Sequence, residues 1–412
     1  MPPAGCTGSA RASVGNDRST LAALTTNALG TRYRWVVLAA GTAAAASFSA
    51  VLLGLPVLAP ALRKEFGLTL TEVGVVLASV WVGPTFTLLP WGLLADRIGE
   101  RLVLSIGLAS MGLFVGGAAL LGGFWGLVIL FGLGSAAGAA VNSASGRAVM
   151  QWFGQDERGL ALGLRQASLP LGGALAALTL PPIEHHGGLD AALLFLAGLC
   201  LGAALLGAAV LRDRPHAPEV EEGIPWTLRD RRLWILSAGS GLYLVTQVSL
   251  TAFIVLFLHD VRGLSIGEAA GVLAVAQTIA VGLRIAVGRW SDRARARIRP
   301  LRIVGLAIFA AMVLSVALLS VPLALLLPAL VVATALSMTW NGLSFTAAAE
   351  LAGVARSGAA IGFQQTALSA IGVATSPAFA VLVDAVSWRA GFGAASLFAL
   401  GGWALLGSLA EN

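Results

Sequence analysis

Two arginines stand inside long apolar stretches of the sequence. Arg284 precedes Gly288 by four residues, about 6 Å along a helix. Arg165 follows Gly159 by six residues, about 9 Å along a helix. An unpaired guanidinium in surroundings of low dielectric constant is costly, and a bound carboxylate offsets much of that cost through two parallel hydrogen bonds. We therefore expect both side chains to bind an organic anion. The alternative is that these long side chains extend to the nearest aqueous surface.

Other polar side chains in apolar stretches are further candidates for such a site. They are five amides and one phenol: Gln166, Gln365, Asn142, Asn341, Gln247 and Tyr243. Tyr243 and Gln247 are four residues apart and therefore share one face of a helix. A polar group in a membrane needs a partner or water, so these residues either line a wet path or hydrogen-bond between neighbouring helices. We take all six as candidate substrate-binding residues.

The composition excludes several classes of function. Of 412 residues, 57% are hydrophobic and 11% are charged, and the mean hydropathy is +0.87, whereas soluble domains carry about 25% charged residues. We expect neither a soluble enzyme nor a nucleic-acid-binding protein, although the net charge is +6. Cys6 and Cys200 are too few and too far apart for a metal site. The sequence contains no phosphate-binding Gly-x-x-x-x-Gly-Lys motif, and we expect no cofactor and no enzymatic activity.

Apolar runs long enough to cross a bilayer recur along the whole chain. A transmembrane helix needs about 20 apolar residues. Twelve such runs lie at 35–58, 73–95, 102–122, 125–148, 160–183, 190–211, 233–258, 268–290, 301–320, 323–348, 358–383 and 389–410. Residues 1–33 lack such a run and predict a disordered cytoplasmic tail. The polar stretch 212–232 predicts a cytoplasmic linker between two six-helix bundles, 34–211 and 233–412.

Basic residues are distributed unequally between the predicted loops. With the N-terminus in the cytoplasm, 19 of the 26 lysines and arginines fall in cytoplasmic segments and 4 in outer ones. Basic residues favour the cytoplasmic side of a membrane protein. The sequence therefore predicts a multi-pass protein of the cytoplasmic (plasma) membrane, surrounded by the lipid bilayer, with both termini in the cytoplasm.

The two halves of the sequence resemble each other. The matching segments are 67–74 with 263–270 and 92–97 with 288–293, each 196 residues apart, and 142–168 with 341–367, 199 residues apart. The last match pairs Asn142 with Asn341 and Gln166 with Gln365. Chance similarity between helices rich in glycine and alanine does not explain ordered matches of Asn, Gln and Asp-Arg. The predicted fold is an all-α membrane protein with twelve transmembrane helices in two pseudo-symmetric six-helix bundles.

The loop after the second predicted span carries a motif of glycines and charges. Its members are Gly92, Asp96, Arg97, Gly99 and Arg101, and the second copy retains Gly288, Asp292 and Arg293. This pattern resembles the signature loop of the major facilitator superfamily, and the resemblance extends over nearly the whole chain. Glu100 stands where that signature is normally basic. The resemblance implies a gating loop whose charges hold the two halves together when the central cavity faces outward.

The resemblance also implies a secondary transporter that works by alternating access around a site near the middle of the membrane. An arginine at the position of Arg284 is similar to those of monocarboxylate and oxalate transporters of the family. We therefore expect a small-molecule substrate, preferably an organic anion (a carboxylate), moved with a proton or in exchange by a functional monomer. Two alternatives stay open. One is proton-coupled export of hydrophobic drugs, although Leu169–Gly173 departs from the antiporter signature, and the other is a non-transporting membrane sensor or scaffold.

Overall fold

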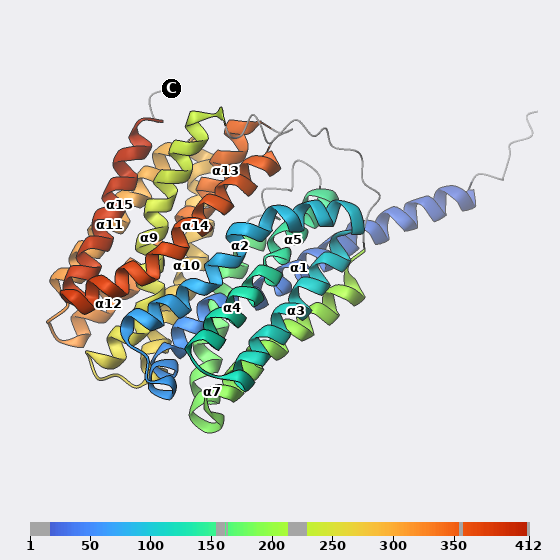
Figure 1. The fold of residues 1–412 in the computed structure, drawn as a ribbon. Helices are drawn as coiled ribbons and strands as arrows, with labels where there is room; N and C mark the ends of the chain where they lie inside the picture. Colours follow the sequence, from blue (N-terminus) through green and yellow to red (C-terminus); the bar gives the residue numbers. More distant parts are fainter. Residues whose placement is uncertain (1–16, 154–160, 162–163, 213–228, 354–356, 410–412) are drawn as a thin grey trace, which may run out of the picture.

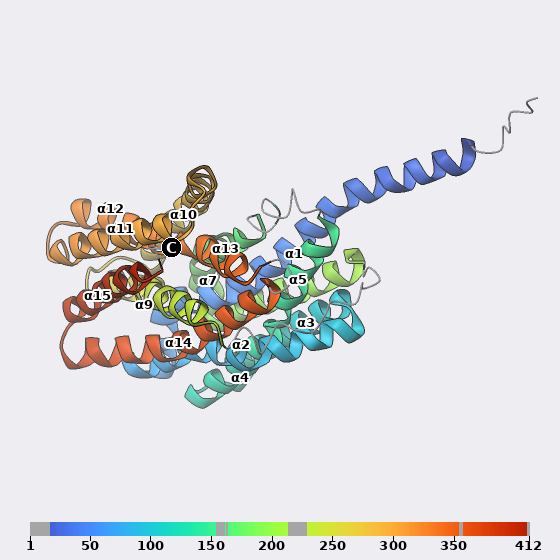
Figure 2. The same cartoon turned by 90° about the horizontal axis from the view of Figure 1, so that it is seen from above.

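The computed structural model describes residues 17–153, 161, 164–212, 229–353 and 357–409, and all regular elements in these ranges are α-helices. The N-terminal half contains α1 (Asp17–Phe66), α2 (Leu70–Ile98), α3 (Glu100–Leu121), α4 (Phe124–Gly138), α5 (Ala140–Trp152) and α7 (Ser168–Val210). The C-terminal half contains α9 (Arg231–Asp260), α10 (Ile266–Ala294), α11 (Ile298–Ala317), α12 (Leu323–Ser337), α13 (Trp340–Ala352), α14 (Ser357–Ala385) and α15 (Trp388–Gly407). The two groups of helices lie side by side (Figures 1 and 2).

The helices provide the predicted number of membrane crossings. Eleven helical stretches among the described residues are long and apolar enough to span a membrane. One of them, Leu164–Val210, has 47 residues, and its backbone leaves the helical conformation at Gly188, where φ is 74°. This break divides the stretch into two crossings, so the count is twelve. The prediction of an all-α membrane protein with twelve transmembrane helices is confirmed.

The two polar segments differ in how far the structure describes them. Helix α1 begins at Asp17, so part of the predicted disordered tail is helical. The segment after Asp17 is rich in alanine and leucine, which favour a helix that is already nucleated by the membrane span. Residues 1–16 of the tail and residues 213–228 of the predicted linker lie outside the described residues.

The duplication inferred from the sequence is visible in local structure. The N-termini of α2 and α10 carry the same capping box, in which Thr69 and Ser265 receive a 3.2 Å hydrogen bond from the backbone N–H of the residue three positions on. Both helices follow a glycine with positive φ, Gly67 and Gly263. The fourth span of each half is broken at equivalent positions: α4 ends before Ala139 and α12 before Met338, 199 residues apart.

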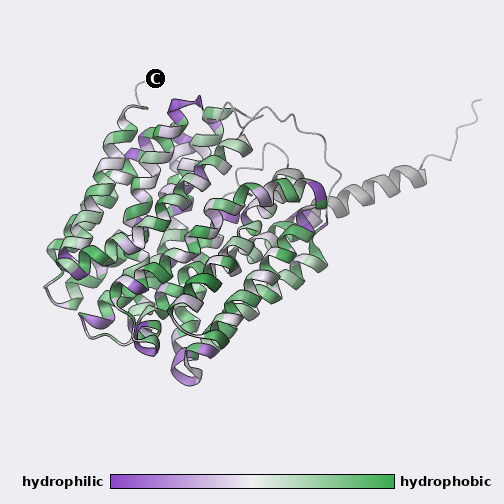
Figure 3. Ribbon diagram, in the orientation of Figure 1, coloured by the Kyte–Doolittle hydropathy of each residue, from purple (hydrophilic) through white to green (hydrophobic). Residues whose placement is uncertain are grey.

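The two ends of the bundle differ in their charges. We call one the latched end; there α1 and α9 finish and α2 and α10 begin, at residues 63–71 and 260–267. We call the other the basic end; it carries the turns at residues 97–101 and 292–297. Hydrophilic residues gather at the helix ends, while hydrophobic residues dominate between them (Figure 3). Large apolar side chains are exposed along the sides of the bundle, such as Leu113 in the middle of α3, which is 69% exposed, as expected for a surface covered by lipid.

Helix α9 is the buried centre of the C-terminal bundle. Its residue Tyr243 is fully buried and packs against Gly305 of α11 and Gly402 of α15. A methyl group added at either glycine would overlap the ring or hydroxyl of Tyr243. The close approach of these three helices therefore depends on glycine at both positions.

We expect Gly305→Ala to destabilise the protein, because the new methyl group overpacks the Tyr243 site at a cost of about 1–3 kcal/mol. Thermal unfolding in detergent checks this by a lower melting temperature. The matched control is Gly282→Ala on α10, where nothing lies within 4 Å of the added carbon and alanine only raises helix propensity. Equal melting temperatures of the two variants would contradict the packing argument.

Candidate substrate site

Polar contacts join the two halves at the latched end. The Arg63 side chain donates a 2.5 Å hydrogen bond to the carboxylate of Asp260, which links the ends of α1 and α9. The hydroxyl and backbone N–H of Thr71 donate to the carboxylate of Asp384 at 2.9 and 3.2 Å, which links α2 to α14. Because each contact has one partner in each half, these bonds close the latched end between the bundles.

Further in, small residues let helices of opposite halves approach closely. Gly173 of α7 lies against the side-chain amide of Gln277 of α10, and Gly372 of α14 lies against the indole of Trp81 of α2. A small apolar cluster fills the space beside the first of these contacts. Its members come from α1, α7, α10 and the α12–α13 region, and they are Leu53, Leu169, Ala280, Leu283, Ala335 and Met338. We call it the apolar plug.

Arg284 lies beside the apolar plug and is hydrogen-bonded by three oxygens. Its Nε donates to the carbonyl of Met338 at 2.6 Å. Its two terminal nitrogens donate to the carbonyl of Gln166 at 2.8 Å and to the side-chain oxygen of Asn341 at 3.0 Å. Gln166 belongs to the N-terminal half and the other three residues to the C-terminal half. The guanidinium therefore bridges the two bundles, and all three acceptors are neutral.

Arg165 lies next to this bridge in the chain but makes fewer contacts. Only 6% of its surface is exposed. One terminal nitrogen donates to the hydroxyl of Ser145 at 3.1 Å, and its Nε is buried with no hydrogen-bond partner. The peptide group of the following residue, Gln166, accepts from Arg284. Arg165 is thus adjacent in sequence to the residue whose carbonyl accepts from Arg284. Neither arginine forms an ion pair with a described carboxylate.

The predicted amides and phenol divide into two groups. The structure brings Gln166 and Asn341 together with Arg284. It does not bring the remaining four into hydrogen-bond contact with that guanidinium; they are Asn142, Gln365, Gln247 and Tyr243. Asn142 and Gln365 are half-buried, Gln247 is buried, and Tyr243 occupies the glycine-lined site inside the C-terminal bundle.

Two buried polar features were absent from the sequence-based candidates. Ser240, Ser344 and Gln364 form a chain of hydrogen bonds at 2.5 and 2.6 Å within the C-terminal bundle. Gln277 is fully buried, and neither atom of its amide has a partner. The available signal for Gln364 was its position beside Gln365. The signal for Gln277 was an amide in an apolar run seven residues before Arg284.

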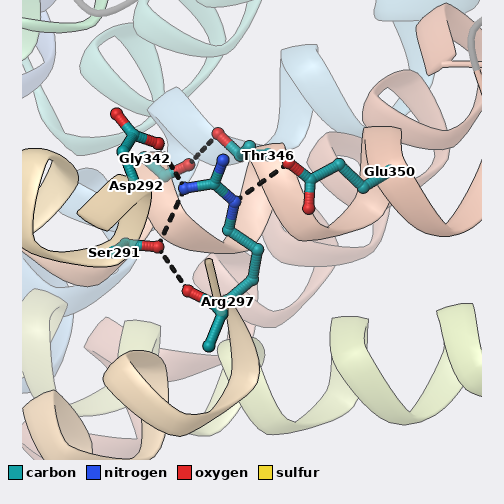
Figure 4. Close-up of polar contacts among 7 residues, drawn as sticks. Ser291, Asp292, Arg297, Gly342, Thr346 and Glu350 are labelled. Atoms are coloured by element: carbon teal, nitrogen blue, oxygen red, sulfur yellow. Dashed lines mark hydrogen bonds and ion pairs between the residues drawn. The ribbon is translucent and has the colours of Figure 1, made fainter. Parts of the chain in front are cut away.

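At the basic end the two copies of the predicted gating loop differ. In the second copy Arg297 donates to Asp292 at 2.6 Å, to Ser291 at 2.9 Å and to Glu350 of α13 at 2.9 Å (Figure 4). Gly288 is half-buried and Arg293 exposed. Arg297 follows Arg101 by 196 residues and is its counterpart in the duplication, although the sequence motif alone does not identify it as a gating residue. This cluster fixes the end of α10 to α13 within one half.

In the first copy Arg97 and Arg101 are exposed, Gly92 is half-buried, and Gly99 has a φ of 89°. The side chain of Asp96 lies outside the described part of the structure. In the second copy Arg295 stands at the position equivalent to Gly99 and has a φ of 48°; no other described residue except glycine has a positive φ. The bend after the motif thus persists although the glycine is lost.

The described residues also form a cavity outside the arginine site, at the basic end. A cavity of about 320 Å³ at the basic end is lined by Arg232, Arg297, Ile298, Ala347, Glu350 and Leu351. Both of its arginines are already paired, Arg232 with Asp230 and Arg297 with Asp292 and Glu350. Within the described ranges, no group of three or more His, Cys, Asp or Glu side chains is placed to hold a metal ion.

Proteins of known family resemble this chain over most of its length. A family model described as the Major Facilitator Superfamily matches residues 37–377. An uncharacterized MFS-type transporter of Mycobacterium tuberculosis is 30% identical over 372 residues, which cover 89% of this chain and 83% of that protein. A probable sulfoacetate transporter of Cupriavidus necator is 28% identical over 52% of this chain and 54% of its own length. A hexuronate transporter of Bacillus subtilis is 26% identical over 57% of this chain and 58% of its own length.

The fold is similar to that of a solved transporter. The inward-facing, unoccupied crystal structure of a bacterial homolog of the human lysosomal transporter Spinster matches with a TM-score of 0.75. The match covers 91% of this chain and 96% of that chain at 16% sequence identity, so it concerns the fold alone. The family model and the Mycobacterium tuberculosis relative both cover most of the sequence, which confirms the family expected from its motifs. The chain belongs to the Major Facilitator Superfamily of membrane transporters.

Proposed function

We propose that this transporter carries organic anions, with a carboxylate or similar group bound by Arg284. The observation that supports this is the guanidinium that bridges the two bundles through neutral acceptors alone. A cation in surroundings of low dielectric constant is stabilised by an anionic partner, and no described carboxylate pairs with it. A transported anion would supply that partner. Arg165, whose Nε is unpartnered, is the second cation of the proposed site.

The relatives support the same class of substrate. Two of the relatives are named as transporters of sulfoacetate and of hexuronate, and both of these compounds are organic anions. The bilobed fold and the position of Arg284 between the lobes suit alternating access, in which one lobe rocks against the other around a central site. We further propose that a monomer in the cytoplasmic membrane performs this cycle with the basic end and both termini in the cytoplasm. Proton symport or exchange for another anion would drive it.

The anion proposal is tested by uptake of labelled carboxylates into proteoliposomes. We expect Arg284→Gln to raise KM about 10- to 100-fold, because a hydrogen bond between charged groups contributes about 1.5–3 kcal/mol. Arg284→Lys keeps the charge but cannot form two parallel hydrogen bonds with a carboxylate, so its KM should be intermediate. The control is Arg302→Gln on α11, whose arginine donates to Trp403. Unchanged uptake by Arg284→Gln would remove this residue from the site, and transport of hydrophobic drugs by the same variant would favour the exporter.

A second test concerns Tyr243, a substrate-binding candidate by sequence that packs inside the C-terminal bundle. We expect Tyr243→Phe to leave the KM for carboxylates unchanged and the melting temperature equal or higher, because its buried hydroxyl has no partner and such a group costs about 1–3 kcal/mol. Uptake assays and thermal unfolding measure the two quantities. A selective rise in KM would instead assign the phenol to the substrate path.

A third test concerns the latch between the halves. We expect Asp260→Asn to increase the population with an open latched end about two- to fivefold, because a solvent-exposed ion pair contributes up to about 1 kcal/mol. Spin labels at the exposed positions Lys64 and Val386, with distances measured by electron paramagnetic resonance, report that population. Asp230→Asn, which breaks an ion pair within one half, is the control. An unchanged distance distribution in Asp260→Asn would show that the pair does not hold the end closed.

A further inference from the structure

Gln277 is the most unusual buried side chain on α10. It is fully buried, and both its amide nitrogen and its amide oxygen lack hydrogen-bond partners. The amide lies against Gly173 of α7, where a methyl group would overlap it. Leaving a buried donor or acceptor unpaired costs about 1–3 kcal/mol. The amide is therefore unfavourable in the state that the structure captures.

The duplication shows that packing alone does not require an amide here. The residue equivalent to Gln277 in the first half is Trp81, 196 positions earlier, and the residue equivalent to Gly173 is Gly372, 199 positions later. The structure places Trp81 against Gly372 just as it places Gln277 against Gly173. The same contact between a large side chain and a glycine is thus made without any amide on the other side of the molecule.

Gln277 and Arg284 lie on the same face of α10, on opposite sides of the apolar plug. The two are seven residues apart, which places them on one face of α10 about 10 Å apart along its axis. Their partners in the N-terminal half, Gly173 on α7 and Gln166 just before α7, are also seven residues apart and run in the opposite direction. Ala280 and Leu283 of the apolar plug lie between them on α10. Gln277 is therefore on the latched-end side of the plug, and Arg284 lies beyond it on the basic-end side.

We propose that Gln277 is a specificity-determining residue that hydrogen-bonds a hydroxyl group of the transported anion while Arg284 holds its carboxylate. When α7 and α10 separate at the latched end, the amide leaves Gly173 and faces the opened path. An amide both donates and accepts, and so matches a hydroxyl group. The spacing from Arg284 selects an elongated, hydroxylated carboxylic acid over a short or purely apolar one. This inference rests on the proposed function for the carboxylate end of the substrate.

The experiment compares two acids of equal chain length, gluconate and hexanoate, in proteoliposome uptake and competition assays. We expect the wild type to prefer gluconate, because a site built for a hydroxyl leaves its amide unpaired with an analogue that lacks one. Gln277→Met, similar in size but without hydrogen-bonding atoms, should raise the KM for gluconate about tenfold and leave that for hexanoate unchanged. Gln277→Asn, which keeps the amide, should retain part of the preference. The matched control Trp81→Met should affect both acids alike.

The outcomes separate this inference from the anion proposal. Equal changes for both acids in Gln277→Met, or no change for gluconate, would overturn the role of Gln277 even where Arg284→Gln abolishes uptake. Selective loss of gluconate uptake in Gln277→Met, together with unchanged uptake in Arg284→Gln, would support the hydroxyl contact and overturn the anion site. A wild type that transports neither acid would overturn both. Thermal unfolding verifies folding, and Gln277→Met should melt no lower than the wild type because it removes a buried unpaired amide.

Discussion

A guanidinium placed between two membrane-embedded bundles must find acceptors in a region where water is scarce, and this requirement organises the centre of the molecule. Two of the three acceptors around Arg284 are backbone carbonyls, those of Met338 and Gln166. Both stand at interruptions of helices: Met338 follows the end of α12, and Gln166 precedes the start of α7. In a regular helix each carbonyl accepts from a backbone N–H of the same helix. At these interruptions the carbonyls are available to accept from the guanidinium. The broken fourth span of the C-terminal half is thus part of the site and not only a feature of packing.

The site is asymmetric although the two halves are duplicates, because equivalent positions carry different side chains. The break before Met338 has a counterpart at Ala139, yet the residue equivalent to Arg284 is Leu88, and the residue equivalent to Gln277 is Trp81. The backbone framework is therefore shared by both halves, whereas the arginine and the amide on this face of the helix occur only in the second. Such a division allows α2 to serve mainly as a packing surface while its counterpart α10 carries groups that can contact a solute. The positions that differ between the two halves therefore indicate the proposed substrate site, whereas the matching positions indicate the shared fold.

The sequence predicted the helices and their number, because apolar runs of membrane length are strong local signals, and it singled out Arg284 as an isolated charge in such a run. It also paired Arg284 with Asn341 and Gln166 as members of one site. It did not place Tyr243, since that position depends on Gly305 and Gly402, which lie far away in the chain. Helical spacing shows which residues share a face but not which neighbour that face meets. The same limit explains why the sequence singled out Gln365 but neither the neighbouring Gln364 nor Arg297, because the hydrogen bonds of these two residues depend on contacts with other helices.

The contacts that close the latched end are weak because they are exposed to solvent. The side chain of Arg63 in its pair with Asp260 is 41% exposed, and exposed ion pairs contribute little to stability. The unpaired amide of Gln277 against Gly173 opposes closure, since a buried unpaired donor or acceptor costs about 1–3 kcal/mol. A ligand can shift a conformational equilibrium only by the difference between its affinities for the two states. A carrier that is to alternate on binding a small anion therefore needs closed and open states of nearly equal free energy. A buried amide that gains hydrogen bonds only on opening is one way to bring them close.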